Sequence, residues 1–283
     1  MLITGCAGFV GSNLCNHLQR DFVGVDNLKF GYRDNLLSKV KWIESDFEKI
    51  DLSSYNTLVH LACANIIYAQ ENMIDTFRIN ALNTIDLFSR FKGKIIYTST
   101  SSVYGNAESY PTNEHSPTRV SNAYDQSKLI AEKYLQLRGN YTTLRLSNVY
   151  GPNQREDHPY SGVIGKFIGQ MKRNQTVSIY AKGISTRDYT YVKDVVRAIE
   201  ICIDLPALNT EINIGTGIET DSLDLAHLIA NLMNNPLNIK YEPPRKIDTI
   251  SRRCLDISKA KKFLNWEPEY NLEKGIKEFL SFC

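Results

Sequence analysis

A tyrosine and a lysine in the segment SNAYDQSK, residues 121–128, could together perform acid–base chemistry. If the segment is helical, Tyr124 and Lys128 lie one turn apart and project from the same face. A phenol ionises with a pKa of about 10, so it acts as a base at neutral pH only where a neighbouring positive charge lowers that pKa. Lys128 could supply the charge. The chain has 16 tyrosines, so the pair alone also fits an ordinary solvated helix face.

A group of hydroxyl side chains follows the apolar segment at residues 94–98. It comprises Thr98, Ser99, Thr100, Ser101 and Ser102. If this segment is a strand of an open parallel sheet, its carboxyl end faces the crevice where ligands bind. We therefore expect these hydroxyls close to the reacting part of a ligand bound in that crevice.

Three glycines, Gly5, Gly8 and Gly11, lie between the first predicted strand and the first predicted helix. Glycines at this spacing let backbone N–H groups approach a pyrophosphate and let the helix pack closely on the sheet. Asp26 ends the second predicted strand, where its carboxylate could accept hydrogen bonds from the ribose hydroxyls and would repel a 2′-phosphate. The pattern predicts an NAD site. Simple turn formation by the glycines and loop initiation by Asp26 are the alternatives.

The elements that must position these residues alternate between β-rich and helical segments, which predicts βαβ units and a parallel sheet. We expect helices near residues 11–19, 76–91 and 125–137. The predicted strands are residues 1–4, 22–25, 41–44, 57–61, 94–98 and 142–146. The fold class is therefore α/β, a doubly wound parallel (Rossmann) sheet.

The second part of the chain has a more irregular pattern. Residues 1–150 are expected to form the dinucleotide-binding domain and residues 151–283 a smaller α/β substrate-binding domain, with returns to the main sheet near residues 188–215. Helices are predicted at 163–173, 192–203 and 222–233, and strands at 177–180 and 211–214. Two short helices separated by the turn at Pro268 should complete the chain.

Composition excludes several classes of protein. The net charge is +2 and no basic block is long enough to follow a phosphate backbone, which argues against nucleic acid as a partner. The six cysteines lack metal-ligand spacing, so we expect no metal site and a reducing, cytoplasmic setting. No uncharged apolar run is long enough to span a membrane, and no signal peptide is evident.

The chain resembles the extended short-chain dehydrogenases/reductases, specifically the nucleotide-sugar epimerase/dehydratase group. The resemblance runs nearly end to end, in a consistent order and spacing of motifs. These motifs are TGCAGFVGSN, VDNLKFG, SDF, VHLACA, NALNT, TSTSSVYG, AYDQSK, LRLSNVYGPNQ, STRDYTYVKDVVRA and LDISKAKKFLNWEP.

The resemblance implies roles for individual residues. It makes Tyr124 the general acid and base, Lys128 its partner and Thr100 the hydroxyl that bonds the reacting sugar oxygen. Ser101, Ser102, Asn148, Arg187 and Arg253 match substrate positions, and a guanidinium fork suits diphosphate oxygens. A surface salt bridge is the alternative role for each arginine. Beside the three glycines and the catalytic pair, the implied NAD-lining residues are Phe9, Val10, Asp26, Asn27, Asp46, Phe47, Leu61, Ala62, Ala64 and Asn80.

The serines after Thr100 narrow the range of reactions that the chain could catalyse. Dehydratases of the group carry an Asp-Glu pair and decarboxylases a glutamate beside this threonine, whereas this chain has Ser101 and Ser102. Without a carboxylic acid to protonate the leaving hydroxyl, dehydration loses its general acid. We therefore predict 4-epimerisation of a UDP-sugar through a 4-keto intermediate. The alternatives are a 4,6-dehydratase, a reductase or a non-catalytic NAD-binding regulator.

The sugar itself stays open between UDP-glucose, its N-acetylated form and UDP-glucuronate. Arg155 and the hydroxyl run favour the glucuronate, whereas Asn148 and the segment PYSGVI at 159–164 favour the other two. Relatives commonly dimerise through the helix pair that corresponds to residues 76–91 and 125–137. The resemblance therefore also implies a homodimer.

Overall fold

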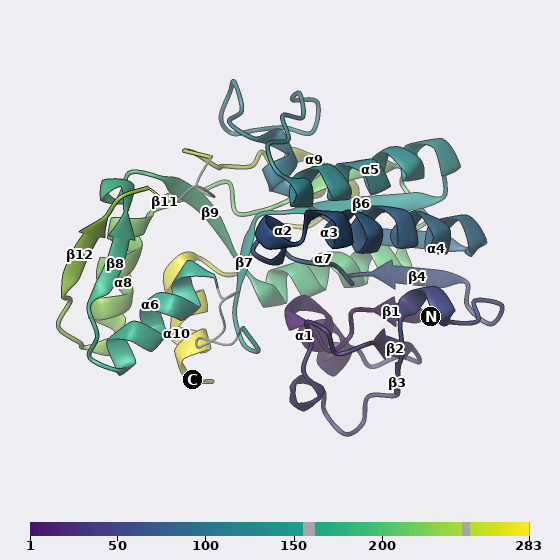
Figure 1. Cartoon of the computed structure of the whole chain (residues 1–283), viewed down its shortest axis with the longest axis horizontal. Coiled ribbons are helices and arrows are strands. Elements are labelled where there is room, and N and C mark those ends of the chain that lie inside the picture. Colours follow the sequence, from purple (N-terminus) through teal and green to yellow (C-terminus); the bar gives the residue numbers. More distant parts are fainter. Residues whose placement is uncertain (155–161, 245–249, 283) are drawn as a thin grey trace.

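The main sheet of the computed structural model has seven parallel strands (Figure 1). The structure describes residues 1–154, 162–244 and 250–282. The strand order is β10-β6-β5-β4-β1-β2-β3, so the direction of winding reverses between β1 and β4. The strands are β1 (Leu2–Thr4), β2 (Val23–Asp26), β3 (Trp42–Glu44), β4 (Thr57–His60), β5 (Lys94–Thr100), β6 (Tyr141–Leu146) and β10 (Thr210–Ile214).

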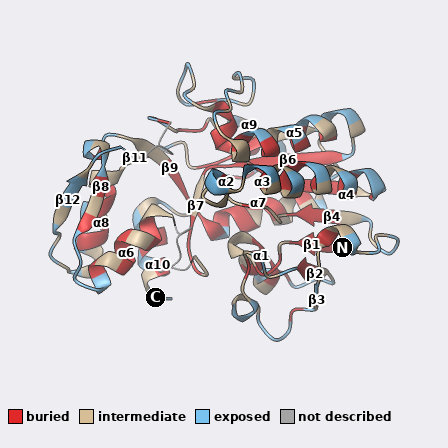
Figure 2. Ribbon diagram, viewed as in Figure 1, coloured by how far each residue is buried: buried red, intermediate tan, exposed pale blue. Residues whose placement is uncertain are grey.

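Successive side chains of each strand point to opposite faces of the sheet, so each strand contributes to two cores. In β1, Ile3 packs against the helices α1 (Phe9–His17) and α7 (Val192–Asp204). Its neighbour Leu2 faces the other core, to which α4 (Thr84–Arg90) and α5 (Ala123–Arg138) contribute. Figure 2 shows the central strands buried between these helices. The predicted doubly wound α/β sheet is confirmed, and each strand expected in it is present.

The helix expected at 76–91 is longer and less regular than predicted. After the one-turn helix α2 (Tyr68–Glu71), the chain forms α3 (Met73–Phe77), a π-helical segment η3 (Arg78–Asn83) and then α4. Such π segments recur at functional sites. The segment carries Asn80, which lies fully inside the protein.

The remaining elements gather beside the carboxyl ends of the main strands (Figure 1). A three-stranded sheet, β11-β9-β7, and a two-stranded sheet, β12-β8, share a core with three helices. Of these strands only β8 is predicted from the sequence. The strands are β7 (Asn148–Tyr150), β8 (Val177–Tyr180), β9 (Thr186–Tyr191), β11 (Glu219–Asp221) and β12 (Ile239–Glu242), and the helices are α6 (Val163–Lys172), α8 (Ser222–Met233) and α10 (Leu272–Leu280).

The chain returns to the main sheet through α7 and β10, which pairs in parallel with β6 from Thr210 opposite Thr142 to Ile214 opposite Leu146. A short helix, α9 (Ser258–Leu264), then packs beside β10. It is followed by Trp266, whose side chain is fully buried and donates a hydrogen bond to the Asp194 carbonyl at 3.0 Å. This contact fixes the last part of the chain to α7.

Short 3₁₀-helical segments also occur between these elements. They are η1 (Arg33–Asn35), η2 (Phe47–Lys49), η4 (Ser101–Tyr104) and η5 (Ala181–Gly183), which follows β8. Within the described ranges the five cysteines are free thiols. No helix in those ranges has the length and apolar character needed to cross a membrane. The same ranges contain no cluster of three or more potential metal ligands.

Candidate active site

A cavity of about 590 Å³ opens at the carboxyl ends of β1, β2, β4 and β5. Its size lies within the range of about 300–1,000 Å³ that is usual for cofactor and ligand sites. It lies at the position where the strand order reverses, which is where open α/β sheets bind their ligands. Among the predicted site residues its wall includes Gly5, Gly8, Phe9, Val10, Gly11, Asp26, Asn27, Asp46, Phe47, Leu61, Ala62, Thr100, Tyr124 and Lys128.

The glycine turn leaves no room for side chains. Gly5 has a φ of +75°, in the left-handed region, and a Cβ there would lie 2.6 Å from the backbone nitrogen of Ala62. A Cβ on Gly11 would lie 1.9 Å from the Gly5 carbonyl oxygen. Glycine is therefore required at both positions, and the exposed backbone at the start of α1 forms the kind of cradle that suits a pyrophosphate.

Asp26 ends β2 at the cavity wall, as the sequence predicts. Its Oδ2 accepts a hydrogen bond from the Ala7 N–H at 2.9 Å, and its Oδ1 accepts one from the Leu28 N–H at 2.8 Å. Each carboxylate oxygen can accept a further bond, so the group can still bind ribose hydroxyls. Burial raises the pKa of Asp26, while these backbone donors lower it.

Two of the predicted cofactor residues, Ala64 and Asn80, do not line the cavity but lie behind its wall. Asn80 accepts a hydrogen bond from the Ala64 N–H at 2.7 Å and donates one to the Ala64 carbonyl at 2.9 Å. Its amide also donates to the Ser127 hydroxyl at 3.1 Å. Asn80 therefore joins the loop after β4 to α5, and it positions the neighbouring wall residues.

Tyr124 and Lys128 lie in the first two turns of α5. Asn122 caps this helix by accepting a hydrogen bond from the Asp125 N–H at 2.9 Å. The ammonium of Lys128 lies 4.3 Å from the centre of the Tyr97 ring, and the residue is 2% exposed. Burial lowers the pKa of Lys128. The phenol and the ammonium thus share one cavity wall, as the helical spacing predicts.

The pKa of Tyr124 differs from the sequence-based expectation. Burial raises it well above its usual value, and the nearby Cys63 and Asp125 raise it further. The groups that lower it are Arg253 and a hydrogen bond with Thr100. In the protein alone, desolvation therefore outweighs the positive charges, and Lys128 is not the dominant influence that the spacing suggested.

Apart from Thr100, the predicted substrate residues lie outside the wall of this cavity, in two groups. Asn148 of β7 accepts a hydrogen bond from the Arg253 guanidinium at 3.0 Å. Arg187 of β9 is close enough to Arg253 to contribute, after burial, to lowering the Arg253 pKa to about 10. Two neighbouring guanidinium groups favour a bound anion. Arg155 and residues 159–161 lie outside the described residues.

Ser101 and Ser102 form the second group, in η4 after β5. Both are buried, with exposures of 2% and 3%. Among the residues that the structure describes, the Ser101 hydroxyl has no hydrogen-bond partner. The Ser102 hydroxyl, by contrast, contacts both Thr100 and Asp125. The structure therefore directs Ser102 into the interior rather than toward the cavity.

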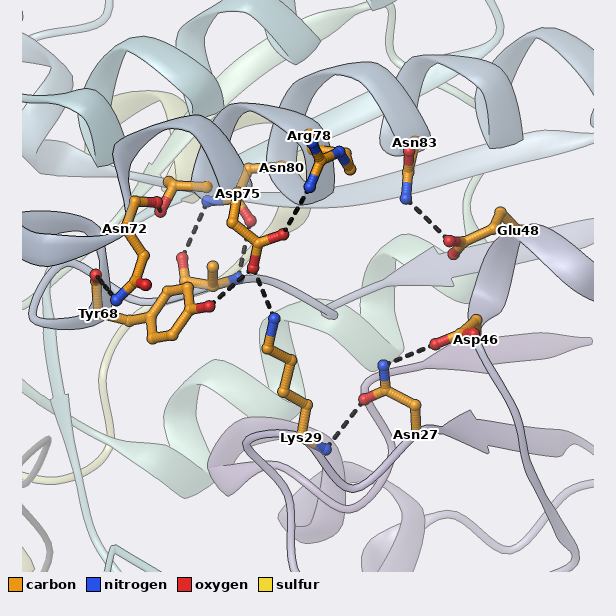
Figure 3. A network of polar contacts seen from close by, with 12 residues as sticks. Asn27, Lys29, Asp46, Glu48, Tyr68, Asn72, Asp75, Arg78, Asn80 and Asn83 are labelled. Atoms are coloured by element: carbon orange, nitrogen blue, oxygen red, sulfur yellow. Dashed lines mark hydrogen bonds and ion pairs between the residues drawn. The ribbon is translucent and has the colours of Figure 1, made fainter.

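The sequence analysis missed a polar network across the cavity (Figure 3). Lys29, which follows β2, forms an ion pair with Asp75 of α3 at 2.6 Å, and both residues line the cavity. Asp75 also accepts a hydrogen bond from the Tyr68 hydroxyl at 2.7 Å and contacts Arg78 at 3.2 Å. The Lys29–Asp75 pair joins positions 46 residues apart, so no local pattern reveals it.

Comparison with known proteins places these features in a family. Residues 1–215 match the model described as "NAD dependent epimerase/dehydratase family". The chain is 33% identical to a "Putative UDP-glucose 4-epimerase" of Methanocaldococcus jannaschii, over 100% of this chain and 97% of that protein. It is 32% identical to "UDP-glucuronic acid decarboxylase 3" of Arabidopsis thaliana, over 98% of this chain and 86% of that protein. A crystal structure of UDP-glucose 4-epimerase with UDP-glucose from Thermotoga maritima superposes with a TM-score of 0.92 and 31% identity, covering 99% and 97% of the two chains.

Proposed function

The chain belongs to the NAD dependent epimerase/dehydratase family, and from this premise we propose that it catalyses NAD-dependent 4-epimerisation of a UDP-sugar. One observation carries the proposal. Tyr124, Lys128 and Thr100 line the same cavity as the glycine turn and Asp26. An acid–base pair and a dinucleotide cradle are therefore combined in one site.

The residues present fit NAD. Gly5 and Gly11 form a turn that a Cβ would fill, and Asp26 presents a carboxylate where the adenosine ribose would lie. That carboxylate favours free ribose hydroxyls over a 2′-phosphate. When bound, NAD supplies a reversible hydride acceptor.

The protein's own residues supply proton transfer and orientation. In the proposed reaction Tyr124 removes the proton of the C4 hydroxyl while C4 gives up its hydrogen as hydride. After the 4-keto sugar has turned, hydride returns to the opposite face of C4 and Tyr124 returns a proton to the oxygen. Thr100 hydrogen-bonds the reacting oxygen, and Lys128 stabilises the ionised phenol. Asn148, Arg187 and Arg253 would bind the diphosphate, which leaves the hexose free to turn.

The side chains near Thr100 support epimerisation over elimination. Thr100 lines the cavity, and the residues next to it in the sequence are the serines Ser99, Ser101 and Ser102. No carboxylate therefore adjoins Thr100 in the sequence. Dehydration would lack the acid that protonates the departing hydroxyl. Because one relative is a UDP-glucuronic acid decarboxylase, loss of CO₂ from UDP-glucuronate is the competing outcome to test.

The experiment is incubation of the purified protein, without added cofactor, with UDP-glucose, UDP-N-acetylglucosamine and UDP-glucuronate. Product configuration at C4 is then followed by NMR. We expect C4 inversion of at least one sugar, without net consumption of NAD. Formation of a 4-keto-6-deoxy sugar or of a pentose would refute the proposal in favour of a dehydratase or a decarboxylase.

We further propose that the protein acts as a cytoplasmic homodimer. Apolar side chains on the outer faces of α3, η3 and α5 are exposed: Ile74 is 78% exposed, Leu82 66% and Leu137 89%. On the same helices Phe88 and Leu135 are buried in the core, whereas Ile130 is 42% exposed. Sedimentation showing only monomer would refute the dimer.

A further inference from the structure

The ammonium of Lys128 lies over the face of the Tyr97 ring, with 4.3 Å between the nitrogen and the ring centre. A cation within about 6 Å of a ring centre is attracted by the negative face of the ring, and more strongly where water is excluded. Water is excluded here, because Lys128 is 2% exposed and Tyr97 is fully buried. The two side chains therefore form a desolvated cation–π pair.

The Tyr97 ring is held from several sides. Tyr97 of β5 pairs with His60 of β4 in the parallel ladder, and the two rings stack with centres 5.9 Å apart and 24° between their planes. Phe88 of α4 packs edge to face against the Tyr97 ring, with centres 5.5 Å apart. The Tyr97 hydroxyl donates a hydrogen bond to the Lys128 carbonyl at 3.4 Å. These contacts give the ring a fixed position beside the ammonium.

The imidazole stacked on the Tyr97 ring is neutral. The Thr84 hydroxyl donates to the Ile79 carbonyl at 2.9 Å, so it accepts from His60 Nε2, which lies 3.1 Å away. His60 Nδ1 then accepts from the Thr4 hydroxyl at 2.7 Å. Burial lowers the pKa of His60 well below its usual value. The imidazole therefore adds no positive charge behind the ring.

The ring attracts Lys128 without occupying its hydrogen-bond donors. An ammonium has only N–H donors to offer, and within residues 1–154, 162–244 and 250–282 those of Lys128 form no hydrogen bond or ion pair. Lys128 also lines the cavity. A carboxylate in place of the ring would accept hydrogen bonds from the ammonium and neutralise its charge. With the ring as partner, both the donors and the charge are available to a ligand in the cavity.

From this geometry we propose that Tyr97 is a positioning residue that holds the ammonium of Lys128 toward bound NAD through the face of its ring. Tyr97 is not among the described residues that line the cavity, so it acts through Lys128. Burial raises the pKa of Tyr97 well above its usual value, so the ring that faces the ammonium is a neutral phenol. The inference rests on the proposed function, because that function places NAD beside Lys128.

A purely structural role for Tyr97 makes a different prediction. Tyr97 belongs to the core between the sheet and the helices α4 and α5, where the apolar stem of Lys128 can pack against any large side chain. In that case the volume of the ring would matter and its electron density would not. Fluorine withdraws electron density from the ring face with little change in size, so fluorination separates the two roles.

The test measures the release of NAD from protein in which Tyr97 is replaced by phenylalanine or by trifluorophenylalanine. Each variant is loaded at a saturating NAD concentration, and release is followed by competition with a fluorescent analogue. Tyr97→Phe keeps the ring face and should release NAD at the wild-type rate. The trifluorinated ring holds the ammonium weakly, so we expect release about tenfold faster, as for the loss of one hydrogen bond from a charged donor. The two variants should have the same melting temperature.

Two controls show whether the ring acts through the ammonium. In a Lys128→Met background the two replacements at position 97 should release NAD at equal rates, because the effects of coupled residues do not add. Trifluorophenylalanine in place of Phe88 is the matched control. Phe88 is equally buried on the same face of the sheet, but no cation in the described part of the chain lies over its ring. This variant should release NAD at the wild-type rate.

Equal release from the phenylalanine and trifluorophenylalanine variants at position 97 would overturn the inference. A fluorine effect that persists in the Lys128→Met background, or that appears at Phe88, would overturn it as well. These outcomes leave the proposed function intact, because NAD release is measured without a sugar. A wild type that binds no NAD would overturn both.

Discussion

The Lys29–Asp75 ion pair should slow the release of NAD. Its two partners come from opposite sides of the cavity, the loop after β2 and the helix α3 (Figure 3). If the pair must separate before the dinucleotide can leave, its free energy adds to the barrier to dissociation. Asp75→Asn removes the charge with little change in shape, so it should weaken the pair without disturbing α3.

The structure sets the size of this effect. The side chains of Lys29 and Asp75 are 38% and 28% exposed, and ion pairs of this exposure contribute about 0.5–1 kcal/mol. Losing the charge also weakens the hydrogen bond from Tyr68, which contributes about 0.5 kcal/mol more. The sum is close to the ~1.4 kcal/mol that changes a rate tenfold. We therefore expect NAD to dissociate about tenfold faster.

The assay loads the protein with NAD and follows its release by competition with a fluorescent analogue. Lys29→Met should have a similar effect, and the double variant should be no faster than either single one, because the two residues act as one pair. Asp204→Asn, which breaks an ion pair with Arg20 away from the cavity, is the control. Release at the wild-type rate from both cavity variants would refute the reasoning.

Three further predictions follow from single residues. Gly11→Ala should abolish NAD binding, measured by calorimetry, because its Cβ would lie 1.9 Å from the Gly5 carbonyl oxygen; binding within twofold of wild type would contradict this. Arg145→Met should cost about 3–5 kcal/mol and lower the melting temperature by about 10 °C, because Glu132 is left fully buried without its cation; an unchanged melting curve would contradict this. Arg253→Lys should raise KM for the UDP-sugar about tenfold with little change in kcat, because an ammonium cannot reproduce the guanidinium fork; an unchanged KM would remove Arg253 from the substrate site.

The main sheet could be predicted because each of its strands is a short apolar run between turn residues. The strands β7, β9, β11 and β12 lack that signal. Thr186–Tyr191 reads TRDYTY, and its partners Asn148–Tyr150 and Glu219–Asp221 are distant in the sequence. The π-helical segment at Arg78–Asn83 likewise has no pattern that distinguishes it from an α-helix.

The candidate site likewise has a part that the sequence predicts and a part that it does not. The glycine turn, Asp26 and the Tyr124–Lys128 pair depend on local spacing, and the structure places them on one cavity. The hydrogen bond between Asn148 and Arg253 joins residues 105 apart in the sequence, and only the family resemblance brought them together in advance. Neither a local pattern nor the family resemblance predicted the contact between Ser102 and Asp125. The raised pKa of Tyr124 depends on burial, which spacing does not reveal.

The most direct test of the account is C4 inversion by Tyr124→Phe. The substitution removes only the phenolic oxygen, so the variant should fold, bind NAD as the wild type does and bind the UDP-sugar. We expect inversion, followed by NMR, to slow by about 10³-fold. Inversion at the wild-type rate, with NAD bound, would show that another group is the base.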